Sequence, residues 1–179
     1  MIELDEFLDN IGRENRDIET LTKAYRWGAM KHDGQLRKNS GLPYFIHPVR
    51  VARNLKAEDD EMIIAGLLHD VLEDTNGTYD EIREQFGYRV AELVKGMTKT
   101  EEISMFQAMD SVINEFPEVV TIKVSDRIDN LTDKFESMPE STKERYRTET
   151  PEIIAYAEKN NKLNLVKELK NLREEIEMS

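Results

Sequence analysis

The sequence IIAGLLHDVLED, residues 63–74, decides the expected fold of this chain. Its apolar residues are typical of a buried helix, which we predict from Asp60 to about Asp74 with Asp59 as the N-cap. Four ionisable residues lie at the end of this segment: His69, Asp70, Glu73 and Asp74. On one continuous helix they would share an arc of roughly 140°, because a helix has about 3.6 residues per turn. Such groups are costly to bury unless they are paired or bind a metal.

Helical periodicity extends over most of the remaining sequence. Further helices are predicted over residues 18–31, 48–55, 79–86, 89–97, 104–115 and 117–135. Pro139 and Pro151 mark two later helix starts. Residues 33–45 break the pattern with glycine, asparagine and proline, and are predicted to form a loop. The tail, about residues 163–177, is amphipathic and is expected to pack on the body of the protein or on a partner helix.

These patterns predict an all-α fold. We expect one compact multi-helix domain over residues 1–179, with a core at about 18–150, because no strand alternation, repeat or linker is evident. The composition agrees, since 39% of residues are hydrophobic, 35% are charged and only 5 are proline. At 179 residues the chain is long enough for one domain with a substantial buried core.

Charge and composition exclude several classes of function. The formal net charge of −12 makes nucleic acid an unfavourable partner, although a metal and local cations can still attract a small phosphorylated ligand. With no cysteine, disulfides and zinc–thiolate sites are excluded. No apolar run is long enough for a membrane span, and the acidic N-terminus is unlike a targeting signal, so we expect a cytoplasmic protein.

Histidine and aspartate residues at distant positions predict a metal site. Of only three histidines, His69 precedes Asp70, and His47 precedes Pro48, where a helix start can turn the imidazole inward. Asp126 and Asn130 are four residues apart on another predicted helix. Two imidazoles and two carboxylates suit manganese, iron or zinc. The simpler interpretations are a solvated helix end, a core or capping histidine, and a local ion pair of Asp126 with Arg127.

Several cations and one aromatic residue accompany these positions. The cations nearest in sequence are Lys31, Arg37, Lys38 and Lys123. Arginine and lysine bind phosphate oxygens, although an ordinary solvated charge run is the alternative. Tyr44 is expected either to stack on a base or to belong to the core. His32 has no such neighbours in sequence and is expected to be exposed.

Longer motifs around these residues resemble one known family. The carrying segments are GQLRKNSGLPYFIHP (34–48), AGLLHDVLEDT (65–75) and, more weakly, GMTK (96–99) and KVSDRIDNL (123–131). Together they resemble the HD-domain phosphohydrolases, and most closely the alarmone-hydrolysing domain of Rel/SpoT-type enzymes and their small stand-alone relatives. The resemblance covers about residues 21–150.

The resemblance implies a set of roles. It implies one divalent metal, usually manganese, bound by His47, His69, Asp70 and Asp126. It implies catalysis by Glu73 and Asp74, with substrate contacts from Arg37, Lys38, Ser40, Tyr44 and Asn130, to which we add Lys123. The implied reaction removes the 3′-pyrophosphate of (p)ppGpp, giving GDP or GTP and pyrophosphate. In this hypothesis the metal lowers the pKa of a water molecule, and one of the two carboxylates orients or deprotonates it.

Four departures from the family pattern affect base and phosphate preference rather than hydrolysis. Asn39 is an extra residue, Asp129 stands where a histidine or aromatic residue is usual, and Thr132 stands where an arginine is usual. The family's Ala-Pro-Leu-Ala stretch after Thr150 is missing. Alternative substrates are another purine pyrophosphate, the 2′-phosphate of a nicotinamide cofactor, or a nucleoside monophosphate. A non-catalytic nucleotide-binding module and a structural ion-pair network are the alternatives outside catalysis. The oligomeric state is not predicted.

Overall fold

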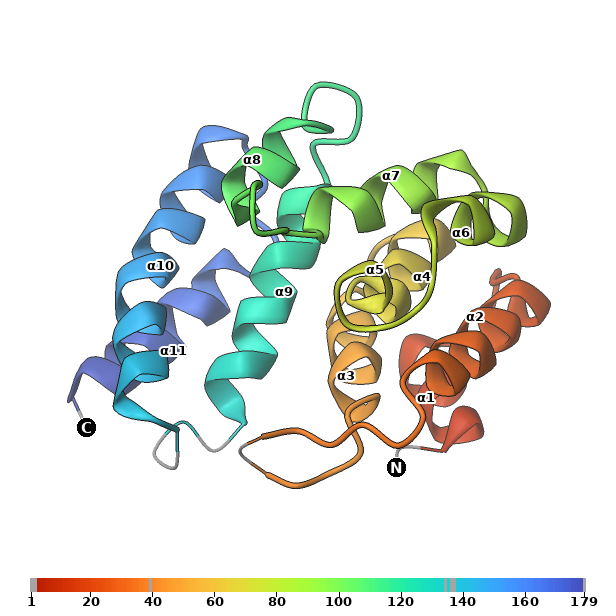
Figure 1. Ribbon diagram of the computed structural model, residues 1–179, viewed down its shortest axis with the longest axis horizontal. Helices are drawn as coiled ribbons and strands as arrows, with labels where there is room; N and C mark the ends of the chain where they lie inside the picture. Colours follow the sequence, from red (N-terminus) through yellow and green to blue (C-terminus); the bar gives the residue numbers. More distant parts are fainter. Residues whose placement is uncertain (1–2, 39, 134, 136–137, 179) are drawn as a thin grey trace.

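Helix α9, Val119–Thr132, runs through the middle of the computed structural model, with helices packed on both sides (Figure 1). The structure describes residues 3–38, 40–133, 135 and 138–178. One side of α9 is covered by α3 (Ile46–Asn54), α4 (Asp60–Leu68) and α7 (Tyr88–Met97), and the other by α10 (Glu140–Lys159) and α11 (Val166–Met178). Because helices cover both sides of α9, 11 of its 14 residues are buried, and the charged residues Asp126, Arg127 and Asp129 are among them.

Four further helices complete the side of the molecule that holds α3 and α4: α1 (Leu4–Ile11), α2 (Ile18–Lys31), α5 (Val71–Asp74) and α6 (Tyr79–Phe86). Helix α8 (Met105–Asp110) lies between α7 and α10. Within the described ranges there is no strand, and the loop before α3 forms one isolated bridge between Leu36 and Pro43. The all-α prediction is therefore confirmed. None of the described helices has the length and apolar character needed to cross a membrane.

The predicted helix from Asp60 to about Asp74 is wrong, because the chain turns at His69 and Asp70. Helix α4 ends at Leu68, and the single-turn α5 begins at Val71. The His69 ring contributes to this ending, since its Nδ1 lies 2.8 Å from the carbonyl oxygen of Gly66. The apolar run continues across the break without glycine or proline, so the sequence pattern carries no stop signal there.

The prediction that Pro151 starts a helix is also wrong. Pro151 lies inside α10, which continues from Glu140 to Lys159. Proline in a helix interior costs about 3 kcal/mol, since it removes a hydrogen bond and crowds the preceding turn. The buried side chains of Ile153, Ile154 and Ala157 continue the packing of α10 beyond this point, and such burial outweighs the local preference.

Helix ends elsewhere differ in smaller ways. Helix α1 was not predicted, and α8 stops at Asp110 rather than Glu115 because residues 111–115 form turns. The predicted tail helix is present as α11 and packs against α9 and α10. The hydrophobic core draws on residues from Phe7 to Leu169. Assignment of residues 1–179 to one domain stays a prediction, and Asn39, the expected insertion, lies outside the described residues.

Close contact between α3 and α4 depends on a glycine. A Cβ atom at Gly66 of α4 would lie 2.8 Å from a methyl of Leu55 and 3.2 Å from the Cα of Ala52 on α3. The Ala52 contact is with backbone, which a side-chain rotation cannot relieve. Gly66 therefore sets the separation of the two helices that carry His47 and precede His69.

We predict that Gly66→Ala lowers the free energy of unfolding by about 1–3 kcal/mol, because α3 and α4 must move apart. Urea titration followed by circular dichroism measures the loss. Met30→Ala on the exposed surface of α2 is the control, with an expected change within about 0.5 kcal/mol. An increase in stability at position 66, typical of glycine-to-alanine changes in uncrowded helices, would contradict the proposed contact.

Candidate metal site and adjoining pocket

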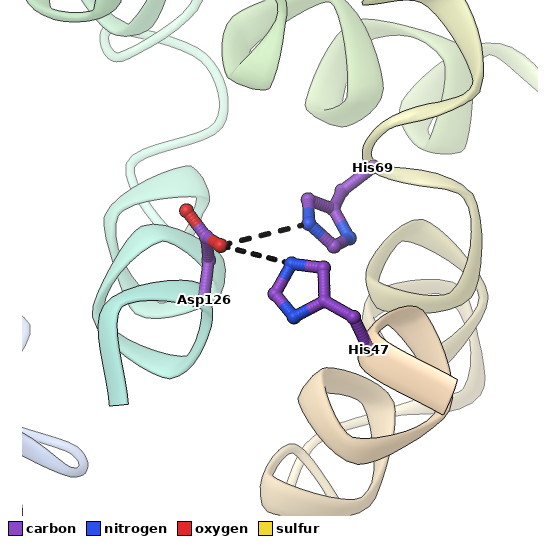
Figure 2. A group of neighbouring side chains, drawn as sticks. All are labelled: His47, His69 and Asp126. Atoms are coloured by element: carbon purple, nitrogen blue, oxygen red, sulfur yellow. Dashed lines mark ion pairs between the residues drawn. The ribbon is translucent and has the colours of Figure 1, made fainter. Parts of the chain in front are cut away.

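Three side chains from separate elements meet beside α9: His47 from α3, His69 from the α4–α5 turn and Asp126 from α9 (Figure 2). The Oδ1 atom of Asp126 lies 3.1 Å from His47 Nε2 and 3.8 Å from His69 Nε2. All three residues are buried, and their potential ligand atoms lie within 4.8 Å of one another. The cluster could therefore hold a metal ion, as the sequence predicted.

The hydrogen bonds of the two imidazoles favour metal binding. His47 Nδ1 lies 2.7 Å from Asp129 Oδ2, and His69 Nδ1 lies 2.8 Å from the Gly66 carbonyl oxygen. Both partners only accept, so each Nδ1 carries a hydrogen and, in the neutral ring, Nε2 presents its lone pair. The buried Nε2 of His69 has no hydrogen-bond partner among the described residues. A cation between these nitrogens and the carboxylates would satisfy them.

Asp70 approaches the same point from the α4–α5 turn. Its Oδ2 lies 3.1 Å from His69 Nε2 and 3.5 Å from His47 Nε2. The Tyr44 hydroxyl donates to this oxygen at 2.6 Å and contacts Asp74 Oδ2 at 3.0 Å. Burial and the charge of Asp70 raise the pKa of Tyr44, so its hydroxyl remains a donor. Tyr44 thus links Asp70 to Asp74 and stacks on His32 with its ring.

The electrostatic field at this cluster favours positive charge. Burial opposes protonation of His47, but hydrogen bonds with Asp126 and Asp129 and the charge of Asp70 outweigh it and raise the pKa of His47 to about 9. Burial alone would raise the pKa values of the Asp70 and Asp126 carboxyls. Neighbouring cationic groups, His69 for Asp70 and Lys123 for Asp126, instead hold both pKa values below the ordinary range.

Asp126 is held in place by its own helix. Asn130 Nδ2 donates to Oδ1 at 2.6 Å, and Lys123 Nζ lies 2.7 Å from Oδ2. These i, i+4 and i, i+3 contacts fix the carboxylate toward the histidines. The alternative interpretation, a local ion pair of Asp126 with Arg127, is not among the described contacts, in which Arg127 pairs with Glu149.

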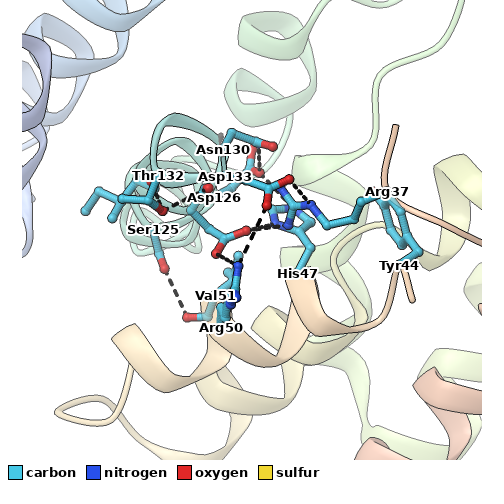
Figure 3. A network of polar contacts seen from close by, with 12 residues as sticks. Arg37, Tyr44, His47, Arg50, Val51, Ser125, Asp126, Asn130, Thr132 and Asp133 are labelled. Carbon is cyan, nitrogen blue, oxygen red and sulfur yellow. Dashed lines mark hydrogen bonds and ion pairs between the residues drawn. The ribbon is translucent and has the colours of Figure 1, made fainter. Parts of the chain in front are cut away.

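A second polar network lies behind His47 (Figure 3). Arg37 Nη1 lies 2.5 Å from Asp129 Oδ2, and Arg37 Nε lies 2.7 Å from Asp133 Oδ2. Arg50 Nη1 stands farther off, 3.7 Å from Asp129 and 3.9 Å from Asp133. Arg37 is only 7% exposed, so this predicted substrate contact is buried in ion pairs with α9.

A cavity of about 290 Å³ adjoins the metal cluster. Nine of the predicted site residues contribute to its lining: Lys38, Tyr44, His47, Asp70, Glu73, Asp74, Lys123, Asp126 and Asn130. Five cations line it together with five carboxylates, although the whole chain has a net charge of −12. The cations that sequence reasoning did not assign are Lys99, Arg127 and Arg145. A bound divalent cation would make this cavity positive.

The two predicted catalytic carboxylates differ in their surroundings. Glu73 Oε2 accepts a hydrogen bond from the backbone nitrogen of Lys99 at 3.2 Å, and Oε1 lies 3.4 Å from Lys99 Nζ. Asp74 accepts from the Tyr44 hydroxyl. Both residues line the cavity one turn beyond Asp70. This places two carboxylates between the metal cluster and solvent.

Other residues singled out from the sequence lie elsewhere. Arg37 and Ser40 do not line the cavity, and Ser40 Oγ lies 3.4 Å from Asp133. Lys31 pairs with Glu81 at 3.1 Å. His32 is 2% exposed, so the expectation of an exposed residue is wrong; its Nδ1 lies 2.8 Å from Gln35 Oε1. Asp129 was noted only as a departure from the family pattern, although it contacts His47.

Comparison with known proteins agrees with this geometry. The sequence profile described as "HD domain" matches residues 24–164. The chain belongs to the HD domain family. A solved structure described as "a metazoan ortholog of SpoT" that "hydrolyzes ppGpp and plays a role in starvation responses" superposes with a TM-score of 0.72, covering 87% of this chain and 94% of the other. At 24% identity, this likeness supports the fold alone.

Relatives of known description were also found by direct sequence comparison. A guanosine-3′,5′-bis(diphosphate) 3′-pyrophosphohydrolase of Aquifex aeolicus is 42% identical over 146 residues, which cover 76% of this chain and 21% of the relative. The bifunctional (p)ppGpp synthase/hydrolase SpoT of Escherichia coli is 36% identical over 150 residues, covering 77% and 21% respectively. The chain therefore spans about a fifth of the length of these relatives.

We predict that His69→Ala abolishes stoichiometric binding of Mn²⁺, because it removes one of three converging ligands. Isothermal titration and metal analysis of the purified protein measure the loss. His32→Ala is the matched control, as it removes a buried histidine that contacts Tyr44 but lies outside the cluster. Undiminished Mn²⁺ binding by the His69 variant would refute the assigned site.

Proposed function

We propose that this HD domain hydrolyses the 3′-pyrophosphate of (p)ppGpp in a metal-dependent reaction, releasing GDP or GTP and pyrophosphate. The observation that carries the proposal is the cavity in which the His47, His69 and Asp126 cluster adjoins four further carboxylates, Glu73 and Asp74 among them, and five cations. A polyanionic substrate needs such cations, and hydrolysis needs an activated water. The names of the relatives supply the substrate.

The proposed metal ligands are His47, His69, Asp126 and Asp70, and manganese is the proposed ion. The mixed nitrogen and oxygen donors suit Mn²⁺, and Asp70 Oδ2 already lies within 3.5 Å of both imidazole Nε2 atoms. When bound, such a metal acts as a Lewis acid and lowers the pKa of water in the cavity. The Tyr44 hydroxyl and the Asn130 amide hold the two carboxylates in orientation.

Glu73 is the proposed residue that orients and deprotonates the attacking water. It lines the cavity beside Asp70, and Lys99 anchors both of its oxygens, Oε2 through the backbone nitrogen and Oε1 through the ammonium group. Each oxygen keeps a further lone pair with which it could accept a hydrogen bond from water. Asp74 is held by Tyr44 and is proposed to position groups near the leaving ribose oxygen. The phosphorus–oxygen bond to the ribose 3′ oxygen breaks, water adds to phosphorus, and its proton passes through these carboxylates to the leaving oxygen.

The proposed substrate contacts are the cations at the rim of the cavity. Lys38 and Lys123 were predicted from the sequence, and Arg145 joins them in the lining. Lys and Arg side chains neutralise pyrophosphate oxygens as charge develops on the leaving group. The ring of Tyr146 and the side chains of Met97 and Met105 give the cavity its apolar surface, which is proposed to contact the purine.

Expectations about partners and location stay predictions. The proposed ligand is a small phosphorylated nucleotide, with no nucleic-acid or membrane partner, in the cytoplasm. The rival substrates from the sequence analysis also contain phosphorus centres that this cavity could accept. A nucleotide-binding module without turnover has no need of two carboxylates beside the metal cluster, so catalysis is favoured.

We predict that Glu73→Gln keeps Mn²⁺ binding but lowers kcat for ppGpp by about 10²–10⁴-fold, since it removes a general base without removing a proposed metal ligand. Pyrophosphate release is measured by chromatography with and without Mn²⁺. Glu84→Gln, an exposed glutamate on α6, is the matched control and is expected to retain turnover. Full turnover by the Glu73 variant would refute its role.

A substrate panel tests the identity of the nucleotide. We expect kcat/KM for ppGpp to exceed that for reduced phosphorylated nicotinamide cofactor and for nucleoside monophosphates by at least tenfold, because a pyrophosphate at the reacting position carries more charge for the rim cations than the single phosphate that reacts in the other compounds. Parallel assays with ppApp report the contribution of the base. Preferential turnover of a monophosphate would replace the proposed substrate while leaving the metal site intact.

A further inference from the structure

We infer that Asp129 is a positioning residue that fixes His47 for metal binding, and that Arg37 is committed to holding Asp129 rather than to contacting the substrate. This inference rests on the proposed metal site but not on the identity of the nucleotide. The sequence analysis assigned Arg37 to the substrate and gave Asp129 no role. The structure brings the two residues together from chain positions 92 residues apart.

The geometry at Asp129 is that of a carboxylate behind a metal-binding histidine. Its Oδ2 lies 2.7 Å from His47 Nδ1, opposite the Nε2 atom that faces Asp126 and Asp70. A hydrogen bond at Nδ1 fixes the tautomer and the ring orientation of a ligating histidine and increases its basicity. His69 receives the same support from a backbone carbonyl, which is neutral. Asp129 therefore gives the site a negatively charged supporting group.

Arg37 completes this arrangement from the loop before α3. The side chains of Arg37, Asp129 and Asp133 are 6%, 3% and 5% exposed, so water contributes little to their solvation. A buried carboxylate needs a cationic partner, and Arg37 supplies one with separate nitrogens to Asp129 and Asp133. If Arg37 turned toward a substrate, the arginine left for both carboxylates among the described contacts would be Arg50, at 3.7 Å from Asp129 and 3.9 Å from Asp133. Its position outside the cavity lining agrees with this commitment.

Lys38, the next residue in the chain, has the opposite arrangement. It lines the cavity and is exposed to solvent, whereas Arg37 points toward α9. The loop backbone fixes this alternation, since the Arg37 amide donates to the Leu42 carbonyl at 2.8 Å and Gly41 donates back to the Arg37 carbonyl at 2.9 Å. The two adjacent cations therefore have different functions: Arg37 supports Asp129 behind His47, and Lys38 faces the cavity that is proposed to bind the nucleotide.

The decisive experiment compares Asp129→Ala with Asp133→Asn by isothermal titration with Mn²⁺. Both changes remove a buried carboxylate from Arg37, but only Asp129 contacts His47. We expect Mn²⁺ affinity to fall by about 10–100-fold in the Asp129 variant and by less than about threefold in the Asp133 variant. Equal losses in both variants, or unchanged affinity at position 129, would overturn the inference.

Asp129→Asn keeps the experiment decisive if the alanine variant does not fold. Its amide oxygen can still accept from Nδ1 while the charge is lost, so weaker Mn²⁺ binding than in Asp133→Asn is expected, and equal binding would overturn the inference. If the unaltered chain binds no Mn²⁺, the metal site and this inference both fail. If it binds Mn²⁺ but does not hydrolyse ppGpp, only the proposed substrate fails.

Kinetics separate the two adjacent cations. We expect Arg37→Lys to raise the Mn²⁺ concentration that gives half-maximal turnover. At saturating Mn²⁺ we expect this variant to have an unchanged KM for ppGpp. For Lys38→Ala we expect a raised KM for ppGpp and an unchanged Mn²⁺ concentration at half-maximal turnover. Lys38 lines the cavity and has no contact with Asp129 among the described residues. If the main effect of Arg37→Lys were a raised KM for ppGpp, Arg37 would be a substrate contact and the inference would be wrong.

Discussion

The structure depends on three carboxylates that surround one imidazole. Asp70, Asp126 and Asp129 all lie within 3.5 Å of a His47 nitrogen; Asp126 and Asp129 are buried, and the Asp70 side chain is 18% exposed. Burying this much negative charge is unfavourable without cations. Lys123 and Arg37 compensate two of the carboxylates directly. A divalent cation bound between His47, His69, Asp70 and Asp126 would compensate the negative charge that these two side chains do not neutralise.

Helix packing determines whether these groups can meet. His47 lies near the start of α3, His69 directly follows α4, and Asp126 lies midway along α9, so no two of them share a helix. The close approach of α3 and α4 at Gly66 brings the two rings to a centroid distance of 5.0 Å. The Ser125 hydroxyl bonds to the Val51 carbonyl at 3.0 Å and fixes α9 against α3. The packing of the helices thus determines how close the three proposed ligands lie to one another.

Sequence reasoning succeeded where local patterns and motif spacing carry the information. Periodicity identified most helices, and the three clustered residues were all predicted as ligands. It failed at the break after Leu68, because no glycine or proline lies between Leu67 and Asp74 to show that the chain turns where the His69 ring contacts the Gly66 carbonyl. It also failed at Pro151, where tertiary burial outweighs a local penalty. The role of Asp129 depends on a contact across 82 residues, which no local pattern contains.

Arg37 illustrates how a motif residue can acquire a different partner. The Arg37-Lys38 pair is part of the motif that resembles the family. A comparison of motifs alone therefore predicts that both residues contact the nucleotide. Two carboxylates one turn apart on α9, Asp129 and Asp133, face the loop and provide a buried site for the guanidinium. A charge-assisted pair out of water is stronger than a rim contact in water, so Arg37 turns inward. Asp129 and Asp133 therefore have two effects. Asp129 orients His47, and the two carboxylates together hold Arg37 away from the cavity that is proposed to bind the nucleotide.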